Sequence, residues 1–211
     1  MKIPKPTIKR LAIYYRCLDN MLSEGKEYVS SKELAERLKI KSSQVRKDLS
    51  YFGEFGKRGV GYNVKSLAAE LKKIIGIDRR WRVVVVGAGN IGRAITNYPG
   101  LYKNRFDVIA VFDNDPHKIG LSAGVAGPIK PMEDLENVVK SKKVEIGVIA
   151  VPAEAAQEVA DSLVKAGIKG IVNFAPVTIN VPPEVVVEDV DITVSFKTLA
   201  YHLRRLGRSR R

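Results

Sequence analysis

Four consecutive valines, Val83–Val86, run directly into the sequence Gly-Ala-Gly-Asn-Ile-Gly. In a strand–turn–helix unit of this kind, the first glycine permits the tight turn and the second lets a pyrophosphate approach the backbone. The third lets the helix pack closely on the strand. The helix N-terminus then offers amide donors and a partial positive charge to the phosphates. The pattern predicts a dinucleotide site at Gly87, Ala88, Gly89, Asn90, Ile91 and Gly92.

The acid that such a site requires also occurs at a suitable distance. A second apolar stretch, residues 108–112, ends in Asp113, 21 residues after Gly92. An acid there binds the ribose 2′-hydroxyl and repels a 2′-phosphate, which predicts NAD(H) in preference to NADP(H). His117 and Lys118 lie just downstream and would weaken that preference. Coenzyme A stays open as an alternative ligand, because its adenosine diphosphate part can use the same phosphate turn.

After about residue 80 the sequence alternates between strand-length apolar runs and helical repeats. Strands are predicted at residues 82–86, 107–112, 145–151 and 171–174, with a further extended stretch at 185–187. Helices are predicted at residues 90–97, 133–140 and 153–166. Such alternation gives a parallel sheet with helices on both faces. The expected fold class is therefore α/β, with a Rossmann-type domain at residues 79–190.

The first third of the chain follows a helical pattern instead. Steps of three and four predict one apolar helix face, formed by Ile8, Leu11, Tyr15, Leu18 and Leu22. Ser30 and Glu33 fit a capping box at the start of a second, short helix. Ser42 or Ser43 is expected to cap a third helix. A glycine-rich hairpin at residues 55–62 and a fourth helix at 64–75 follow.

Two short helices with a tight turn, followed by a basic hairpin, are typical of a winged helix-turn-helix domain, which we assign to residues 1–78. The third helix would enter the major groove of double-stranded DNA, and the hairpin tip would suit a narrow minor groove. Tyr51 and Tyr62 could equally be buried. The predicted DNA-binding residues are Ser43, Gln44, Arg46, Lys47, Tyr51, Arg58, Gly59 and Tyr62.

The distribution of charge favours the same interpretation. Residues 1–80 hold 19 lysines and arginines against 9 acids, whereas residues 81–196 hold 11 against 14. Such asymmetry is typical of a chain that meets a polyanion with one end. A lysine-rich solvated surface, or a small protein-interaction domain, is the alternative that charge alone leaves open.

Candidate catalytic groups are few, so we predict that the chain is not an enzyme. A dehydrogenase needs a proton donor or acceptor beside the nicotinamide. The two histidines, His117 and His202, are expected at the adenosine end and on a C-terminal helix. No cysteine–histidine cluster indicates a metal site. An NAD(P)-dependent oxidoreductase, or a coenzyme A-binding regulator with an accessory DNA-binding domain, remains the alternative.

Features of the whole chain lead us to expect a cytoplasmic protein. Cys17 is the single cysteine, so an internal disulfide cannot form. The N-terminus lacks the apolar run of a signal peptide. The densest apolar stretches are too short to span a bilayer.

Five short segments stand out when the chain is taken as a whole: residues 45–53 (VRKDLSYFG), 58–62 (RGVGY), 98–100 (YPG), 167–171 (GIKGI) and 173–176 (NFAP). Together these segments resemble the Rex family of bacterial redox-sensing transcriptional repressors. The resemblance extends over nearly the whole chain in the same order.

This resemblance implies a homodimer that represses transcription from palindromic operator DNA and is released when NADH binds. NADH and NAD⁺ would then be regulatory ligands. It also implies that the C-terminal segment, residues 191–211, contains a helix swapped into the partner, followed by a basic tail. Tyr98 and Asp191 match positions on the nicotinamide side, and Arg16 matches an interdomain switch position. The remaining residues expected in the cofactor site are Val151, Pro152 and Phe174.

Overall fold

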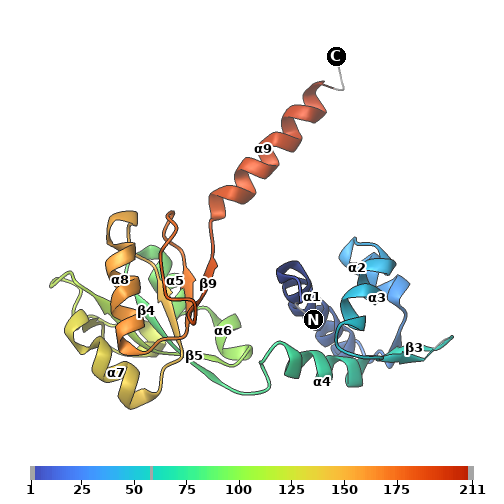
Figure 1. The fold of residues 1–211 in the computed structure, drawn as a ribbon, viewed down its shortest axis with the longest axis horizontal. Coiled ribbons are helices and arrows are strands. Elements are labelled where there is room, and N and C mark those ends of the chain that lie inside the picture. The colour runs from blue at the N-terminus through green and yellow to red at the C-terminus, as the bar shows by residue number, and fades with distance from the viewer. Residues whose placement is uncertain (1–2, 58, 209–211) are drawn as a thin grey trace. The chain divides into compact units, whose positions relative to one another are not determined.

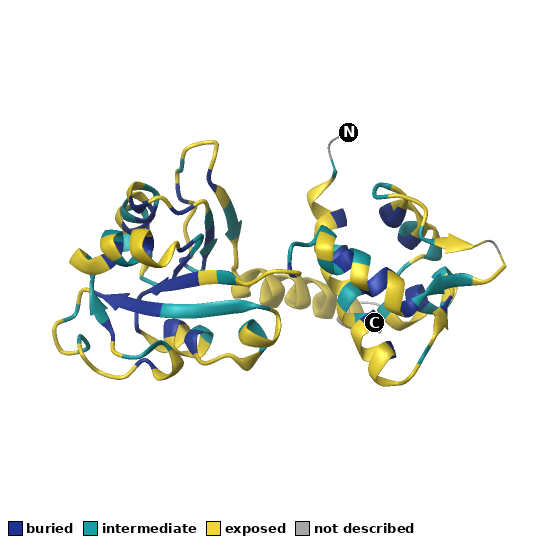
Figure 2. Cartoon of the chain, turned by 90° about the horizontal axis from the view of Figure 1, so that it is seen from below, coloured by how far each residue is buried: buried dark blue, intermediate teal, exposed yellow. Residues whose placement is uncertain are grey.

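The structure, a computed structural model, describes residues 3–57 and 59–208. The chain divides into two compact units, Met1–Arg79 and Arg80–Arg211. Figure 1 shows their elements, and Figure 2 shows that each unit has its own buried core. Each unit is described by itself below.

The first unit is a winged helix-turn-helix. Its helices are α1 (Lys5–Ser23), α2 (Ser31–Leu38), α3 (Ser42–Ser50) and α4 (Val64–Ile74). Its strands are β1 (Tyr28–Val29), β2 (Gly56–Lys57) and β3 (Gly61–Asn63), paired antiparallel in the order β1-β3-β2. The two-residue strand β1 was not predicted, because its extended form depends on its partner β3.

The buried face of α1 differs from the predicted one. Leu11 and Leu18 are buried as expected, but Ile8 and Leu22 are 42% and 37% exposed. Their places in the core are taken by Thr7, Tyr14 and Met21. The face is rotated because Thr7 and Tyr14 donate hydrogen bonds to Asp48 on α3, which an apolar repeat does not reveal.

The caps of the two short helices also differ in part from the prediction. The Ser30 side chain accepts from the Glu33 amide, as in a capping box, but the Glu33 carboxylate pairs with Lys26. The N-cap of α3 is Lys41, whose side chain makes no capping hydrogen bond, so the predicted serine cap is wrong. Ser42 and Ser43 instead lie inside the first turn of α3.

The second unit is a parallel α/β sheet. Its strands are β4 (Trp81–Val86), β5 (Phe106–Asp113), β6 (Lys130–Pro131), β7 (Ile146–Ile149), β8 (Gly170–Asn173) and β9 (Val186–Asp189). All neighbours are parallel, in the order β6-β5-β4-β7-β8-β9. Numbered within this unit, the order is 3-2-1-4-5-6, which is that of the Rossmann fold.

Helices and short turns connect these strands. They are α5 (Asn90–Thr96), α6 (Pro99–Lys103), α7 (Leu135–Lys142), α8 (Ala153–Ala166) and α9 (Ile192–Arg208), with 3₁₀ turns at Gly124–Ala126 and Met132–Asp134. The helix predicted at 133–140 begins later because the 3₁₀ turn occupies its start. The strand predicted at 145–151 is shorter, and α6 and β6 were not predicted.

The valine run shows why β4 is the central strand. Val84 and Val86 are buried on the face packed by α7 and α8, while Val83 and Val85 belong to the core on the opposite face. Because strand side chains alternate between faces, an unbroken apolar run is what a strand buried on both sides requires. The carboxyl end of β4 is thereby held at the middle of the sheet edge.

Candidate dinucleotide site and nucleic-acid interface

The glycine loop between β4 and α5 requires glycine at two positions for steric reasons. Gly87 has a φ of 102°, and a Cβ there would overlap the carbonyl oxygen of Ala150 after β7. A Cβ on Gly92 would overlap the Gly87 carbonyl oxygen. Gly89 differs, since a Cβ there, apart from Gly89 itself and its two chain neighbours, has no heavy atom of the described chain within 4 Å. Gly89 therefore borders open space, as expected where a pyrophosphate approaches.

Asp113 lies beside this loop and is nearly buried, at 7% exposure. Its Oδ2 accepts a hydrogen bond of 2.7 Å from the Ala88 amide, and Lys118 Nζ lies 3.2 Å from the same oxygen. Burial alone would raise the pKa of Asp113, but these hydrogen bonds lower it below its ordinary value. The acid is thus ionised and attached to the loop that it was predicted to serve.

The other predicted cofactor residues lie at the same edge or next to it in sequence. Val151 and Pro152 follow β7, and a Val151 methyl lies 3.0 Å from the Cβ position of Gly87. Phe174 follows β8, and its amide donates to the Ile149 carbonyl at 2.9 Å. Carboxyl ends of parallel strands, where the strand order reverses, are where such sheets bind ligands.

Tyr98 and Asp191 are exposed at the starts of two helices. Tyr98 is 60% exposed and precedes α6, with its ring against Gly100. Asp191 Oδ1 accepts from the Thr193 amide at 2.8 Å. Hydrogen bonding by the Thr193 side chain, followed by that of its amide, lowers the pKa of Asp191. Neither residue contacts the glycine loop through a bond that the structure records.

Arg93 is a loop contact that the sequence interpretation missed. Its Nε donates to the Ala88 carbonyl at 3.2 Å, from the first turn of α5. Ala88 is therefore held by Asp113 through its amide and by Arg93 through its carbonyl. A cation four residues after the second loop glycine is the sequence signal that could have indicated this contact.

The predicted DNA-binding residues gather on α3 and the hairpin. Ser43, Arg46 and Lys47 are exposed on α3. Arg46 Nη1 donates to Ser31 Oγ on α2 at 3.0 Å. Ser31, Arg46 and Lys57 line one open groove, which Glu54 also borders. The groove therefore connects α2, α3 and the hairpin.

The remaining members of that set differ in exposure. Gly59 is exposed, whereas Gln44, Tyr51 and Tyr62 are half-buried. The Tyr62 ring packs against Gly56, and its burial raises the pKa of its hydroxyl. Arg58 lies outside the described residues. Arg16 is exposed on α1, where it borders a hollow with Cys17, Asn20, Glu24 and Arg37.

A buried carboxylate on α3 was not predicted as a site residue. Asp48 is 0% exposed. Its Oδ1 accepts from Thr7 Oγ1 at 3.0 Å, Arg10 Nη2 at 2.8 Å and Gln44 Nε2 at 2.9 Å. Its Oδ2 accepts from Arg10 Nε at 2.5 Å and Tyr14 Oη at 2.7 Å.

These contacts predict how acid affects the first unit. Burial alone would raise the pKa of Asp48, but the hydrogen bonds, led by that from Arg10, lower it from 3.8 to about 2. A carboxylate whose pKa is lower in the folded than in the unfolded chain stabilises the fold at a pH above its pKa in the unfolded chain. This stabilisation disappears as the pH falls to its pKa in the folded chain. The stabilisation from Asp48 should therefore be complete near neutral pH and be lost from about pH 4 to about pH 2.

The measurement is acid unfolding followed by circular dichroism, for the wild type and Asp48→Asn. At neutral pH the variant should be the less stable protein. The difference in free energy of unfolding should narrow as the pH falls through this window. A difference that stays constant down to pH 2 would contradict the assignment of the shift to Asp48.

Known proteins resemble this chain over its whole length. The family described as "Putative DNA-binding protein N-terminus" matches residues 2–50, and that described as "CoA binding domain" matches residues 78–177. The redox-sensing transcriptional repressor Rex of Thermosipho africanus is 57% identical over 206 residues, covering 97% of both chains. Rex 1 of Thermotoga maritima is 56% identical over 204 residues, covering 97% of both.

The chain belongs to the Rex family. Solved Rex structures share its fold throughout. RSP in complex with NAD⁺ and operator DNA superposes with a TM-score of 0.92 at 37% identity, covering 100% of this chain and 96% of that one. RSP in complex with NADH gives a TM-score of 0.88 at 35% identity and covers 100% of both. The predicted family, the helical DNA-binding unit and the Rossmann-type sheet are thus confirmed, whereas the individual site residues stay predictions.

Two further observations concern metal binding and membrane insertion. Within residues 3–57 and 59–208, no group of three or more histidine, cysteine or acidic residues is arranged to hold a metal. No helix of that same part of the chain combines the length and apolarity needed to cross a bilayer.

Proposed function

We propose that this chain is a transcriptional repressor that reports the NADH/NAD⁺ ratio. It binds a palindromic operator as a homodimer and leaves the operator when NADH binds its Rossmann-type sheet. The observation that carries the proposal is the union, in one chain, of a helix-turn-helix and a Rossmann sheet. RSP, which has the same whole-chain fold, is described in complexes with NAD⁺ and operator DNA and with NADH.

The energetics of release set a requirement on the ligand. NADH shifts the equilibrium only if it binds the released form better than the operator-bound form. Moving most of the protein from bound to free takes about 3–5 kcal/mol of differential binding. Asp113 would bind the adenosine ribose, which NADH and NAD⁺ share, so discrimination must arise at the nicotinamide ring. We assign that task to Tyr98 and Asp191, and we assign to Arg16 the role of an interdomain switch residue.

Release is tested by fluorescence anisotropy of a labelled palindromic operator bound to the full chain. NADH should lower the operator affinity, and NAD⁺ at equal concentration should lower it much less. An operator affinity that NADH leaves unchanged would overturn the proposal. Steady oxidation of NADH with a carbonyl substrate would favour the oxidoreductase alternative. Competition by coenzyme A would favour a coenzyme A-binding regulator.

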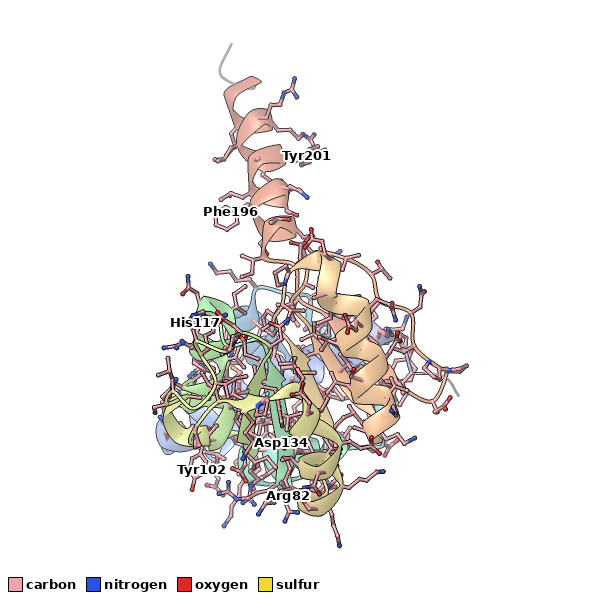
Figure 3. All side chains as sticks on the ribbon, turned by 90° about the vertical axis from the view of Figure 1, so that its left-hand side faces the viewer. Arg82, Tyr102, His117, Asp134, Phe196 and Tyr201 are labelled. Atoms are coloured by element: carbon pink, nitrogen blue, oxygen red, sulfur yellow. The ribbon has the colours of Figure 1, made fainter. Side chains whose placement is uncertain are left out.

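The proposed dimer rests on helix α9, within residues 191–211. Among its described side chains, Phe196, Leu199, Leu203 and Leu206 form an apolar stripe and are 55–69% exposed. Figure 3 shows Phe196 and Tyr201 standing on α9 away from the sheet. An apolar stripe of this length is costly to leave in water. We assign its burial to the partner subunit of the homodimer.

This assignment predicts the effect of a charge in the stripe. Leu199→Lys should convert the dimer to a monomer, because burying an unpaired ammonium group is strongly unfavourable. Thr198→Lys is the matched control, since Thr198 lies on α9 outside the stripe. Sedimentation velocity distinguishes the species, and equal dimer content in both variants would contradict the prediction.

A further inference from the structure

The recognition helix α3 has a polar as well as an apolar attachment to the rest of its unit. Val45 and Leu49 are its apolar anchors, at 0% and 2% exposure. Asp48 lies between them in sequence and is equally buried. The helix has 9 residues and begins at a lysine cap without a capping hydrogen bond. Little within α3 itself therefore fixes where it starts or how it is rotated.

The Asp48 carboxylate supplies the missing restraint. Thr7, Arg10 and Tyr14 lie on one face of α1, at successive turns, and each donates to it. Burial of apolar side chains is non-directional, so it restrains the rotation of a helix less sharply than hydrogen bonds do. Hydrogen bonds weaken steeply when bent or stretched. Bonds from three turns of α1 to one carboxylate therefore define both the register and the rotation of α3.

Stability alone is a weak explanation for this cluster. A buried ion pair often contributes no more than well-packed apolar residues of the same volume, because desolvation offsets the attraction. Removing a single partner is nevertheless costly. Such a cluster adds little net stability, but any movement of α3 that breaks one of its hydrogen bonds is costly. It therefore favours a single position of α3.

The cluster also determines the orientation of a predicted DNA-reading side chain. Gln44 Nε2 donates to Asp48 Oδ1 at 2.9 Å. An ionised carboxylate only accepts hydrogen bonds, so the Gln44 amide cannot be flipped without placing two oxygens together. Its Oε1 and one N–H remain for other partners, which is the pair of groups that recognises adenine in the major groove.

We propose that Asp48 is a positioning residue for sequence recognition, which sets the rotation of α3 and the Gln44 amide without itself contacting DNA. The inference rests on the proposed function, because it assumes that α3 reads an operator. It predicts that disturbing the cluster reduces discrimination between DNA sequences. Electrostatic attraction to any duplex should persist, since exposed cations such as Lys47 are unaltered.

The test compares the affinity of the full chain for an operator duplex with its affinity for a duplex of scrambled sequence. NADH affinity, measured by fluorescence, checks that the second unit is unchanged. Tyr14→Phe removes one donor and keeps the ring. Asp48→Asn places an amide nitrogen among donors. Tyr28→Phe is the control, since Tyr28 is an exposed tyrosine of the same unit. Thermal unfolding identifies folded variants, and Tyr14→Phe decides the question if Asp48→Asn does not fold.

The operator-to-scrambled affinity ratio should fall by about tenfold in Tyr14→Phe, equivalent to about 1.4 kcal/mol. Scrambled-duplex affinity and its salt dependence should match those of Tyr28→Phe. An unchanged ratio, or a parallel loss on both duplexes, would overturn the positioning role and leave the proposed function intact. A wild type that fails to discriminate would overturn the proposed function itself.

Discussion

Replacing Gly89 by alanine should shift the response to NADH to much higher concentrations while leaving the fold intact. A Cβ at Gly89 meets no described heavy atom within 4 Å, so the ligand-free chain accommodates it. The methyl group would occupy the space in which the pyrophosphate approaches the loop. We expect NADH affinity to fall by roughly 100-fold, or about 2.7 kcal/mol. Operator binding should persist at NADH concentrations that release the wild type.

Gly92→Ala provides the contrast. Its Cβ would overlap the Gly87 carbonyl oxygen, so β4 and α5 would have to separate. That change should lower the thermal unfolding temperature as well as NADH affinity. Isothermal titration with NADH and differential scanning calorimetry separate the two cases. Equal NADH affinity in Gly89→Ala and the wild type would show that the ligand does not approach the loop there.

Reversing the charge of Lys47 should strongly weaken operator binding without changing NADH binding. Lys47 is exposed on α3, one residue before the buried Asp48. A lysine there can donate to guanine acceptors or to phosphates, and a glutamate would be repelled by both. We expect operator affinity to fall by about 100-fold, or about 2.7 kcal/mol.

Lys142→Glu is the matched control for this effect. It changes the net charge equally, at an exposed position in the second unit. Operator affinity at a stated salt concentration, measured by anisotropy, should change little in this variant. A similar loss in both variants would mean that overall charge, rather than contact by α3, accounts for the effect.

The nucleotide unit was predictable because its rules are local. A valine run, three glycines and an acid at the end of the next strand occur at set spacings, and backbone sterics explain two of the glycines. The same patterns predicted helix 153–166 with the bounds that the structure gives. Short elements such as β1 and β6 were missed, because a two-residue strand is defined by its neighbour and not by its own sequence.

The polar core of the first unit shows what local rules miss. An aspartate beside Lys47 in a short helix is expected in solvent, so Asp48 was not predicted as a buried residue. Its partners Thr7 and Tyr14 are 41 and 34 residues away in sequence. The same long-range contacts rotated the buried face of α1 relative to its apolar repeat. Local sequence patterns do not predict contacts between residues that lie so far apart in the chain.

NADH and the operator are proposed to oppose each other's binding to this chain, and such coupling must be reciprocal. If NADH weakens operator affinity by a given factor, a saturating operator must weaken NADH affinity by the same factor. The measurement is isothermal titration of NADH into the free protein and into its operator complex, in the same buffer. We predict that NADH binds the operator complex more weakly than the free protein, by the factor found from anisotropy. Equal NADH affinity for the free and operator-bound protein would contradict it.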